Sequence, residues 1–221
     1  MAGYKDIATK IYEDISQRIL SLELKPGISF SENDVCEKYN ASRTPVRSAM
    51  QRLADKGLID LLPYQKTRVS KIDLNLVKQL VYARSAIEDR VIRDFIKIDD
   101  PLLIEDVEHL IRKQQIVVNN EESNIEQFYE LDAKMHRLWY ESVGAIPIWD
   151  YFQDSIHYTR QRRVDIIDHH SMQVVIEDHL KILNAIREKN TDCIYAILHE
   201  HLYGGIDRVS NNSELAGYLA Q

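Results

Sequence analysis

The chain has 221 residues, enough for two domains, and its hydrophobic fraction of 44% is that of an ordinary globular protein rather than a disordered one. No apolar run approaches the length of a membrane span, and the N-terminal stretch lacks the apolar core of a signal peptide. Only two cysteines occur, Cys36 and Cys193, so a disulfide framework is excluded and we expect a cytoplasmic protein.

The net charge of −7 is unevenly distributed along the chain. Residues 1–71 carry 12 Lys+Arg against 9 Asp+Glu, a net of +3, whereas residues 72–221 carry 16 against 26, a net of −10. This asymmetry indicates a module that tolerates phosphate joined to one that does not. A net of +3 is a weak signal by itself, because many solvated domains match it.

The first elements of the chain are helical. From residue 4 to residue 22, isoleucines and a leucine recur at helical spacing, and the sequence 25–27, Lys-Pro-Gly, then breaks that helix. Ser31 is placed to cap a second helix, with Asp34 three residues on as in a capping box. This helix is expected to end near Tyr39.

A third helix and a hairpin follow. Ser42 is expected to cap a helix that runs to about residue 56, with Pro45 in its first turn and Gly57 at its end. Residues 58–62 and 67–70 are typical of two short strands around a turn. The order of elements is that of a winged helix-turn-helix, so we predict a DNA-binding domain over residues 1–71 with three helices and a two-stranded wing.

After this domain every segment is typical of helix, so the chain is mainly α. The expected spans are 73–98, 101–119, 124–143, 147–167, 172–189 and 191–209. Short connections favour an antiparallel bundle of about six helices over residues 72–209. We expect residues 210–221 to form a loose C-terminal tail.

Arg43, Thr44 and Arg47 gather on the first turn and a half of the third helix. The N-terminal part of a recognition helix faces base edges in the major groove, and arginine can bond guanine through two acceptors. The alternative is a solvated helix with ordinary arginines, and composition alone leaves the two about even.

Four polar residues fall on the apolar faces of three predicted helices: Asp132, His136, His179 and His201. One buried histidine is usually a hydrogen-bonded core residue, but a buried carboxylate is costly unless it is paired or binds a metal. The i, i+4 spacing of Asp132 and His136 presents two ligands from adjacent turns. Spacing alone favours a divalent transition metal slightly, and zinc, nickel, iron, cobalt and manganese all suit these ligands, with zinc or nickel our first candidates.

The N-terminal motifs resemble the GntR family of bacterial regulators. They are Leu24-x-Pro-Gly-x-x-x-Ser-Glu, Ser-Arg-Thr-Pro-Val-Arg at residues 42–47, and Leu53-x-x-x-Gly-Leu-Ile. The resemblance implies that Arg43 and Arg47 contact bases or flanking phosphates, that Ser42 and Thr44 anchor the DNA backbone, and that a wing carrying Lys66 and Arg68 reaches the minor groove. Some members place an arginine early in the second helix, where this chain has Asn33.

The helical region resembles the FCD ligand-binding domain of the FadR branch of this family. The motifs that carry the resemblance are Arg84-x-x-x-Glu88, Asp132-x-x-x-His136, Glu177-Asp178-His179 and His201-Leu202. It implies that Asp132, His136, His179 and His201 are metal ligands and that Arg84 grips a carboxylate of the effector. Glu88 is then a structural partner. We interpret Arg160, Arg162 and Arg163 as a solvated face, with some chance that one of them reaches the ligand pocket.

The leading hypothesis is a transcription regulator, expected to be a repressor, that responds to a small carboxylate metabolite. We expect a homodimer on an inverted-repeat operator, because one recognition helix reads too few base pairs. A metal-dependent enzyme acting on a small organic acid is the alternative, although no convincing general base or nucleophile accompanies the histidines. A metal-stabilised interaction module without an effector is the third possibility.

Overall fold

The computed structural model describes residues 7–61, 66–120, 124–165 and 169–220. They fall into two compact units, one made of residues 1–74 with 212–221 and the other of residues 75–211. Most of the turn predicted between the two wing strands lies outside the described residues. Among the described helices, none combines the length and apolarity that crossing a membrane requires.

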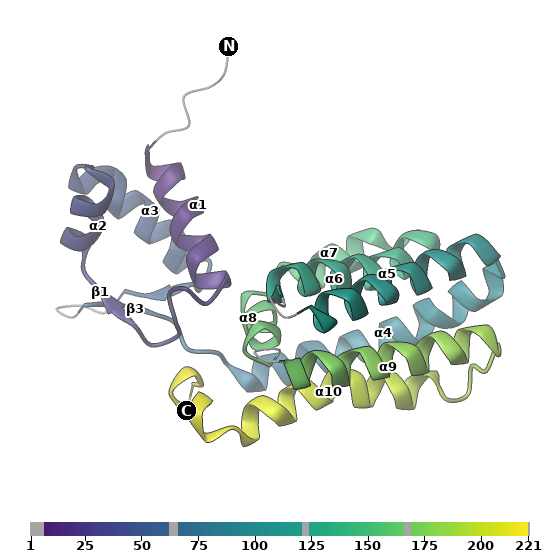
Figure 1. The fold of residues 1–221 in the computed structure, drawn as a ribbon. Coiled ribbons are helices and arrows are strands. Elements are labelled where there is room, and N and C mark those ends of the chain that lie inside the picture. The colour runs from purple at the N-terminus through teal and green to yellow at the C-terminus, as the bar shows by residue number, and fades with distance from the viewer. Residues whose placement is uncertain (1–6, 62–65, 121–123, 166–168, 221) are drawn as a thin grey trace, which may run out of the picture. The chain divides into compact units, whose positions relative to one another are not determined.

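The N-terminal unit is built on three helices, as the sequence predicts (Figure 1). They are α1 (Ile7–Leu20), α2 (Glu32–Tyr39) and α3 (Arg43–Asp55). The isoleucines of α1 are buried at positions 11, 15 and 19, facing the buried side of α3. The capping box is present, because the Ser31 hydroxyl accepts from the Asp34 backbone and the Asp34 carboxylate accepts from that of Ser31. Gly57 ends α3 at a φ of +72°, which glycine adopts without strain.

The wing is a three-stranded antiparallel sheet rather than a two-stranded one. Its strands β1 (Ser29–Phe30), β2 (Ile59–Asp60) and β3 (Thr67–Val69) lie in the order β1-β3-β2. Ser29 pairs with Arg68, and Ile59 pairs with Val69. The extra strand β1 has two residues, which is too short to give an alternating pattern in the sequence.

The second unit is an all-helical bundle, as predicted (Figure 1). Its described helices are α4 (Leu74–Ile98), α5 (Pro101–Asn119), α6 (Ile125–Ser142), α7 (Ile146–Gln153), α8 (Ile156–Asp165), α9 (His169–Arg187) and α10 (Ile194–Asn211). The segment predicted as one helix over 147–167 is two helices, α7 and α8. The chain bends at residues 154–155, where the Ser155 hydroxyl is within hydrogen-bond distance of the Tyr158 backbone N–H at 3.5 Å, which a periodic apolar pattern does not reveal.

One apolar core runs through the bundle, with α5 packed against α6 and α9. Its fully buried members include Ile92, Phe95, Ile111, Phe128, Met135, Trp139, Ile182 and Leu198. Because α6, α9 and α10 all contribute to this core, polar side chains on their inner faces are brought together inside the bundle.

The C-terminal segment is ordered over its described residues, so the expectation of a loose tail is wrong. A 3-10 helix, η1 (Ser213–Tyr218), follows α10, and Leu215 is buried. Leu219 forms a parallel bridge with Ile72, whose backbone N–H donates to the Tyr218 carbonyl over 2.9 Å. A pairing between residues so far apart in the sequence leaves no local signal.

Candidate metal centre and DNA-reading surface

The four residues predicted as metal ligands meet inside the bundle. Asp132 and His136 lie one turn apart on α6, His179 lies on α9 and His201 on α10. One ligand atom from each lies within 4.8 Å of the others, and all four side chains are almost fully buried. Three different helices therefore present one carboxylate and three imidazoles to a common point.

Two of the three histidine rings are held by a hydrogen bond at Nδ1. The Nδ1 atom of His136 donates to the Glu88 carboxylate, and that of His179 donates to the Gln114 side-chain oxygen over 2.8 Å. The Nδ1 atom of His201 lies 3.7 Å from the Asp178 carboxylate. The Nε2 atoms of His136 and His179 are buried without a hydrogen-bond partner. Buried ring nitrogens without partners, on rings held by a second acceptor, are what metal-binding histidines present.

Two of the imidazoles, those of His136 and His179, are in the protonation state that binds a metal. Burial lowers the pKa of His179 to about 4, despite the nearby Asp132 carboxylate, and burial also lowers the pKa of His136. Both rings are therefore neutral at pH 7. Neutral imidazole and an ionised carboxylate are the protonation states that a metal ion requires.

The Asp132 carboxylate is divided between two sets of partners. Its Oδ1 lies 3.3 Å from the Nε2 atom of His179 and 3.8 Å from that of His136, whereas Oδ2 accepts from Arg162. Burial alone would raise the pKa of the Asp132 carboxyl, but the Arg162 guanidinium, with the two histidines, holds it well below its usual range. The cluster therefore fits a divalent transition metal bound through Oδ1.

Glu88 links the metal cluster to Arg84. One oxygen of Glu88 accepts from His136, and the other accepts from the Arg84 Nε over 2.7 Å and from the Tyr140 hydroxyl over 3.2 Å. Arg84 is fully buried and also donates to the Tyr158 hydroxyl. Burial would raise the pKa of the Glu88 carboxyl, but Arg84 and His136 lower it well below its usual value. Glu88 is thus an ionised structural partner, with both oxygens engaged.

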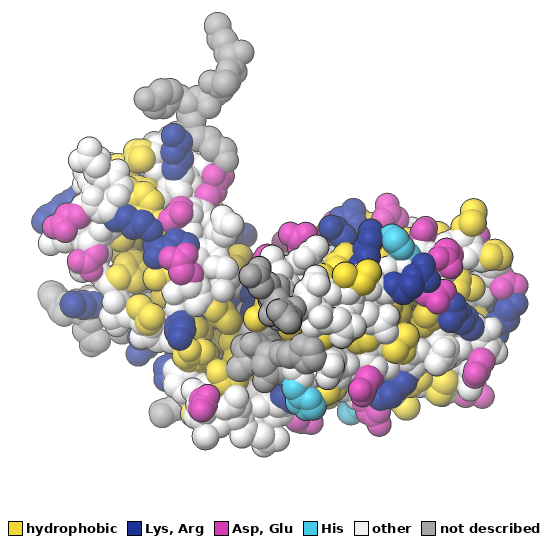
Figure 2. All heavy atoms as spheres, in the orientation of Figure 1, with side chains coloured by type: hydrophobic (Ala, Val, Ile, Leu, Met, Phe, Trp, Pro, Cys, Tyr) yellow, Lys and Arg dark blue, Asp and Glu magenta, His cyan; other side chains and the backbone are white. Residues whose placement is uncertain are grey.

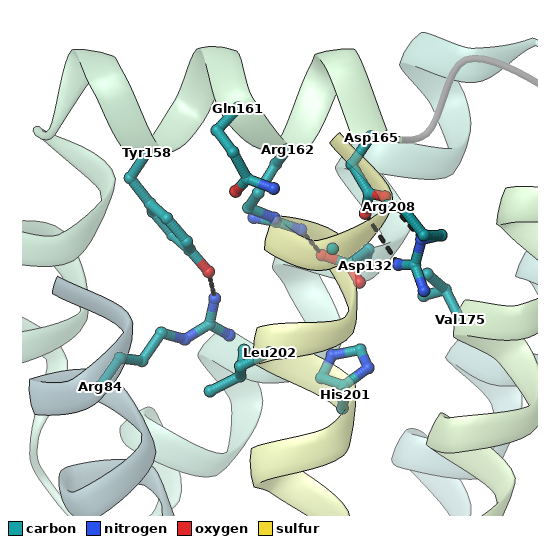
Figure 3. A pocket seen from close by; sticks show the side chains of 11 residues that line it. Arg84, Asp132, Tyr158, Gln161, Arg162, Asp165, Val175, His201, Leu202 and Arg208 are labelled. Atoms are coloured by element: carbon teal, nitrogen blue, oxygen red, sulfur yellow. Dashed lines mark hydrogen bonds and ion pairs between the residues drawn. The ribbon is translucent and has the colours of Figure 1, made fainter. Parts of the chain in front are cut away.

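A small cavity adjoins the cluster (Figure 3). Its volume is about 30 Å³, room for a few water molecules. Arg84, Asp132 and His201 line it, and so do Tyr158, Arg162 and Arg208. The sequence-predicted effector residue Arg84 and two of the predicted ligands therefore border the same cavity.

The interpretation of Arg160, Arg162 and Arg163 as a solvated face is wrong. Arg160 is fully buried, Arg162 reaches Asp132 at the cavity, and Arg163 pairs with Glu126 at the surface. The short helix α8 packs against α10 and turns Arg160 and Arg162 inward, so the alternative that one of the three reaches the pocket describes Arg162. The sequence of α8, poor in apolar residues, does not indicate this direction.

Gln114 was missed in the sequence, although a signal exists. It lies on the buried face of α5 with Val107, Ile111 and Val118, so it is a polar residue on an apolar stripe. The same pattern identified the histidines, and applied to α5 it would have found Gln114.

In the N-terminal unit, the predicted base-contacting residues are open to solvent. Ser42, Arg43, Thr44 and Arg47 are all exposed at the start of α3, and the two arginine side chains are each 67% exposed. Ser42 stands at the N-cap position, but its side chain makes no capping hydrogen bond. These four residues are therefore accessible to a ligand that approaches the end of α3.

Two residues of α2 accompany these arginines. The Glu32 carboxylate accepts from the Arg47 Nε over 2.9 Å and lies 3.9 Å from the Arg43 Nε. An Nη atom of Arg43 lies 3.5 Å from the side-chain oxygen of Asn33, the residue that departs from the family arginine. An acidic and an amide side chain thus lie among the residues that the sequence assigned to DNA binding, and neither was predicted there.

The described end of the wing adds two basic residues to this surface. Lys66 is exposed and lines an open hollow together with Arg47 and Glu32. Arg68 is half-exposed and lies 3.2 Å from the Asp60 carboxylate on the neighbouring strand. On the face of this unit drawn in Figure 2, basic side chains alternate with acidic ones rather than forming a continuous patch.

Comparison with known proteins places these features in a family. Residues 7–69 match the bacterial regulatory proteins of the gntR family, and residues 79–204, more than half of the chain, match the FCD domain. The chain belongs to the GntR family of regulators and carries an FCD domain. The two matches fall on the winged helix-turn-helix and on the helical bundle, so this GntR-family protein is a transcription regulator rather than an enzyme.

Individual relatives agree with this assignment. The HTH-type transcriptional repressor RspR of Escherichia coli K12 is 28% identical over 87% of this chain and 84% of its own length. The gluconate operon transcriptional repressor of Bacillus subtilis 168 is 20% identical over 91% of this chain and 84% of its own. The fold is similar to that of a GntR regulator from Rhodococcus sp. RHA1 (TM-score 0.67, 18% identity, 93% and 98% covered) and of E. coli McbR/YncC (TM-score 0.65, 18% identity, 92% and 97% covered).

Proposed function

We propose that this GntR-family protein is a repressor whose affinity for its operator is set by a small carboxylate effector, bound beside a zinc or nickel ion in the helical bundle. Two of the relatives described above carry the name of repressor, which supports the direction of regulation. The free thiols of Cys36 and Cys193 are consistent with action in the cytoplasm.

The observation that carries the proposal is the pair of buried Nε2 atoms without partners, on His136 and His179, that lie beside the Asp132 carboxylate. An unpaired buried ring nitrogen costs free energy, and a metal ion is the partner that serves several of them at once. Asp132, His136, His179 and His201 would hold the ion, which would offer open coordination positions to a carboxylate oxygen.

Arg84 is suited to hold the effector from the other side of the cavity. Its guanidinium can offer donors in a fork, and a carboxylate matches that geometry. The same side chain fixes Glu88, which in turn fixes the His136 ring. An acid bonded to Arg84 would therefore be coupled to the metal ligand His136 through two contacts, Arg84 to Glu88 and Glu88 to His136.

On the DNA side, Arg43 and Arg47 of α3 would read base edges, with Ser42 and Thr44 anchoring the backbone. Lys66 and Arg68 of the wing would contact phosphate or the minor groove. A homodimer on an inverted repeat would double the number of base pairs read. Exposed aromatic side chains on α4 and α10, Tyr82 and Tyr195, offer apolar surface for pairing of two bundles.

The two covalent connections between the units would transmit effector binding in the bundle to the DNA-binding unit. Helix α4, which carries Arg84, begins at Leu74, where the first unit passes into the second. Helix α10, which carries His201, ends at Asn211, where the chain returns to the first unit. A shift of either helix on effector binding would therefore act directly on a segment joined to the DNA-binding unit.

The test is to select bound sequences from random DNA with metal-loaded protein and then to screen small carboxylic acids for release of the selected operator. We expect one class of acid to weaken operator binding about ten-fold or more. A protein that binds metal and operator but responds to no acid would support the interaction-module alternative. A protein that turns over the acid would support an enzyme.

Arg84→Lys is the variant that isolates the effector contact. Arg84→Ala would leave the buried Glu88 unpaired, at a cost of about 3–5 kcal/mol, whereas lysine keeps the charge and loses the fork. We expect Arg84→Lys to retain metal and operator binding and to lose most of the response to acid. An unchanged response would exclude Arg84 as the effector contact.

A further inference from the structure

Three guanidinium groups converge on the cavity beside the metal cluster. Arg84 comes from α4, Arg162 from α8 and Arg208 from α10 (Figure 3). The sequence suggested Arg84 for this place and offered Arg162 as one of three arginines that could reach it, and the fold adds Arg208. Such a concentration of positive charge in a cavity of about 30 Å³ requires a matching set of anions.

The protein itself supplies one carboxylate for each arginine. Arg84 pairs with Glu88 over 2.7 Å, Arg208 pairs with Asp165 over 2.6 Å, and Arg162 pairs with Asp132. Among the described residues that line the cavity or bond to its arginines, three positive charges therefore meet three negative ones. Asp178, behind His201, has its own partner in Lys181 at 2.8 Å.

A bound divalent ion changes this balance. Its three imidazole ligands are neutral when they bind metal, and its one carboxylate ligand, Asp132, already balances Arg162. The loaded site would thus carry an excess of about two positive charges in a buried place. An uncompensated buried charge is costly, and an anionic ligand is the remaining way to compensate it.

We propose that the effector of this site is a dianion: one anionic group completes the coordination of the metal and is also the group that Arg84 contacts, and the second anionic group is bonded to Arg162. This inference rests on the proposed function and deepens it by naming the charge of the ligand. Arg162 is the arginine of choice because its partner Asp132 cannot neutralise both a guanidinium and a metal ion. Its guanidinium also lies over the rings of Tyr129 and Tyr158, each 5.7 Å away, which keep it at the cavity.

The size of the cavity limits the dianion to a small one. The side chains around it must move to admit even a four-carbon acid, and Arg162, 16% exposed, must leave Asp132 to bond such a ligand. Short dicarboxylates carry two separate anionic groups, whereas hydrogen phosphate carries two charges on one group, so comparing them tests whether two groups are needed. The matched monocarboxylates have nearly the same shape and half the charge.

The same charge count predicts an order of binding. Without the ion, a dianion would add two negative charges to a balanced set, whereas with the ion it restores balance. The dianion should therefore bind only the metal-loaded protein. By linkage it should raise the affinity for the metal by the same factor.

The experiment measures dissociation constants by calorimetry for succinate, butyrate, malonate, propionate and inorganic phosphate, on metal-loaded and on chelator-treated protein. We expect each dicarboxylate to bind the loaded protein roughly ten- to a hundred-fold more tightly than its monocarboxylate, the range of one charge-assisted contact. Succinate should also raise the affinity of the protein for the metal, measured by competition with a chelator. Butyrate should raise this affinity much less. Tight phosphate with weak succinate would overturn the two separate anionic groups, because phosphate carries its charges on one group.

Arg162→Gln is the variant that tests the role of Arg162 most directly, and Arg163→Gln is its control. Removal of Arg162 lowers the excess charge of the loaded site from about two to about one, so the preference for succinate over butyrate should fall at least five-fold. Arg163 is adjacent on α8 but pairs with Glu126 outside the cavity, so its variant should keep the wild-type preference. Metal content and circular dichroism establish that each variant is folded and loaded.

The outcomes separate this inference from the function on which it rests. Butyrate and succinate that bind the loaded wild-type protein equally well would overturn the dianion, and if butyrate also releases the operator the proposed function would stand. Arg162→Gln with an unchanged preference would overturn the role of Arg162. A loaded protein whose operator binding responds to no acid would overturn the proposed function itself.

Discussion

The Glu32 carboxylate holds the Arg47 guanidinium by its Nε edge, with the Arg47 Nε 2.9 Å from one carboxylate oxygen and 3.1 Å from the other. A guanidinium bonded through Nε keeps its two Nη atoms available, and these are the atoms that pair with the two acceptors of guanine. An acidic side chain on the proposed DNA-reading surface would repel phosphate, but here it also fixes the arginine that is proposed to read bases.

Glu32→Gln should therefore change specific and nonspecific binding in opposite directions. Loss of the negative charge should strengthen binding to scrambled DNA, and loss of the ion pair should weaken binding to the selected operator by about 1 kcal/mol, since Arg47 must then be ordered by the DNA itself. Fluorescence anisotropy with both DNAs measures the two affinities. Glu37→Gln removes an exposed carboxylate from the same helix and should shift both affinities equally. If Glu32→Gln also shifts the affinities for operator and scrambled DNA equally, Glu32 acts only as a surface charge and does not order Arg47.

Substitutions in α3 and in the wing should differ in their effect on the affinity for DNA. Arg43→Ala or Arg47→Ala should cost about 1–3 kcal/mol of specific binding each, with folding unchanged. Lys66→Ala should weaken binding to all sequences and flatten the salt dependence by about one unit. Arg68→Ala should have a smaller effect, because Asp60 already shares its charge. Operator affinity that is unchanged in both α3 variants would exclude that helix as the reader.

Loss of one histidine ligand should release the metal and lower thermal stability. His179→Ala removes a buried ring from the cluster, whereas the control His199→Ala removes an exposed ring stacked on Tyr203. With free metal a hundred-fold above its dissociation constant, binding contributes about 2.7 kcal/mol, so His179→Ala should lose about 5–10 °C of metal-dependent Tm. Elemental analysis and thermal scans with and without chelator measure both effects. A His179→Ala protein that keeps its metal would contradict the assigned ligand set.

The buried histidines also predict the pH dependence of the metal-free protein. Burial lowers the pKa of folded His179 to about 4, against about 6.5 for an unfolded histidine. Between these values the unfolded chain binds a proton that the folded chain does not, so the free energy of unfolding falls as the pH falls from about 6.5 toward 4. Urea midpoints of chelator-treated protein at several pH values measure this slope. His179→Gln should make the slope shallower, and an identical slope would show that His179 does not contribute to it.

Periodicity predicted most of this fold because most of its elements are long amphipathic helices. The Asp132–His136 pair could be found in the sequence because i, i+4 spacing on an apolar face fixes both residues on one side of α6. The sequence could not choose Arg162 among the three arginines of α8, because α8 has little apolar content and its direction is set by packing against α10. The strand β1 and the pairing of Leu219 with Ile72 depend on tertiary contacts, which a local pattern does not encode.

One metal-dependent site in the bundle is proposed to govern the binding of DNA by the winged helix-turn-helix. The most direct measurement is the affinity for the selected operator, with and without the active acid, on metal-loaded, chelator-treated and reloaded protein. We predict that the acid weakens operator binding about ten-fold or more in the loaded protein, has no effect on the chelator-treated protein, and regains its effect on reloading. A chelator-treated protein that responds to the acid as fully as the loaded one would contradict this account.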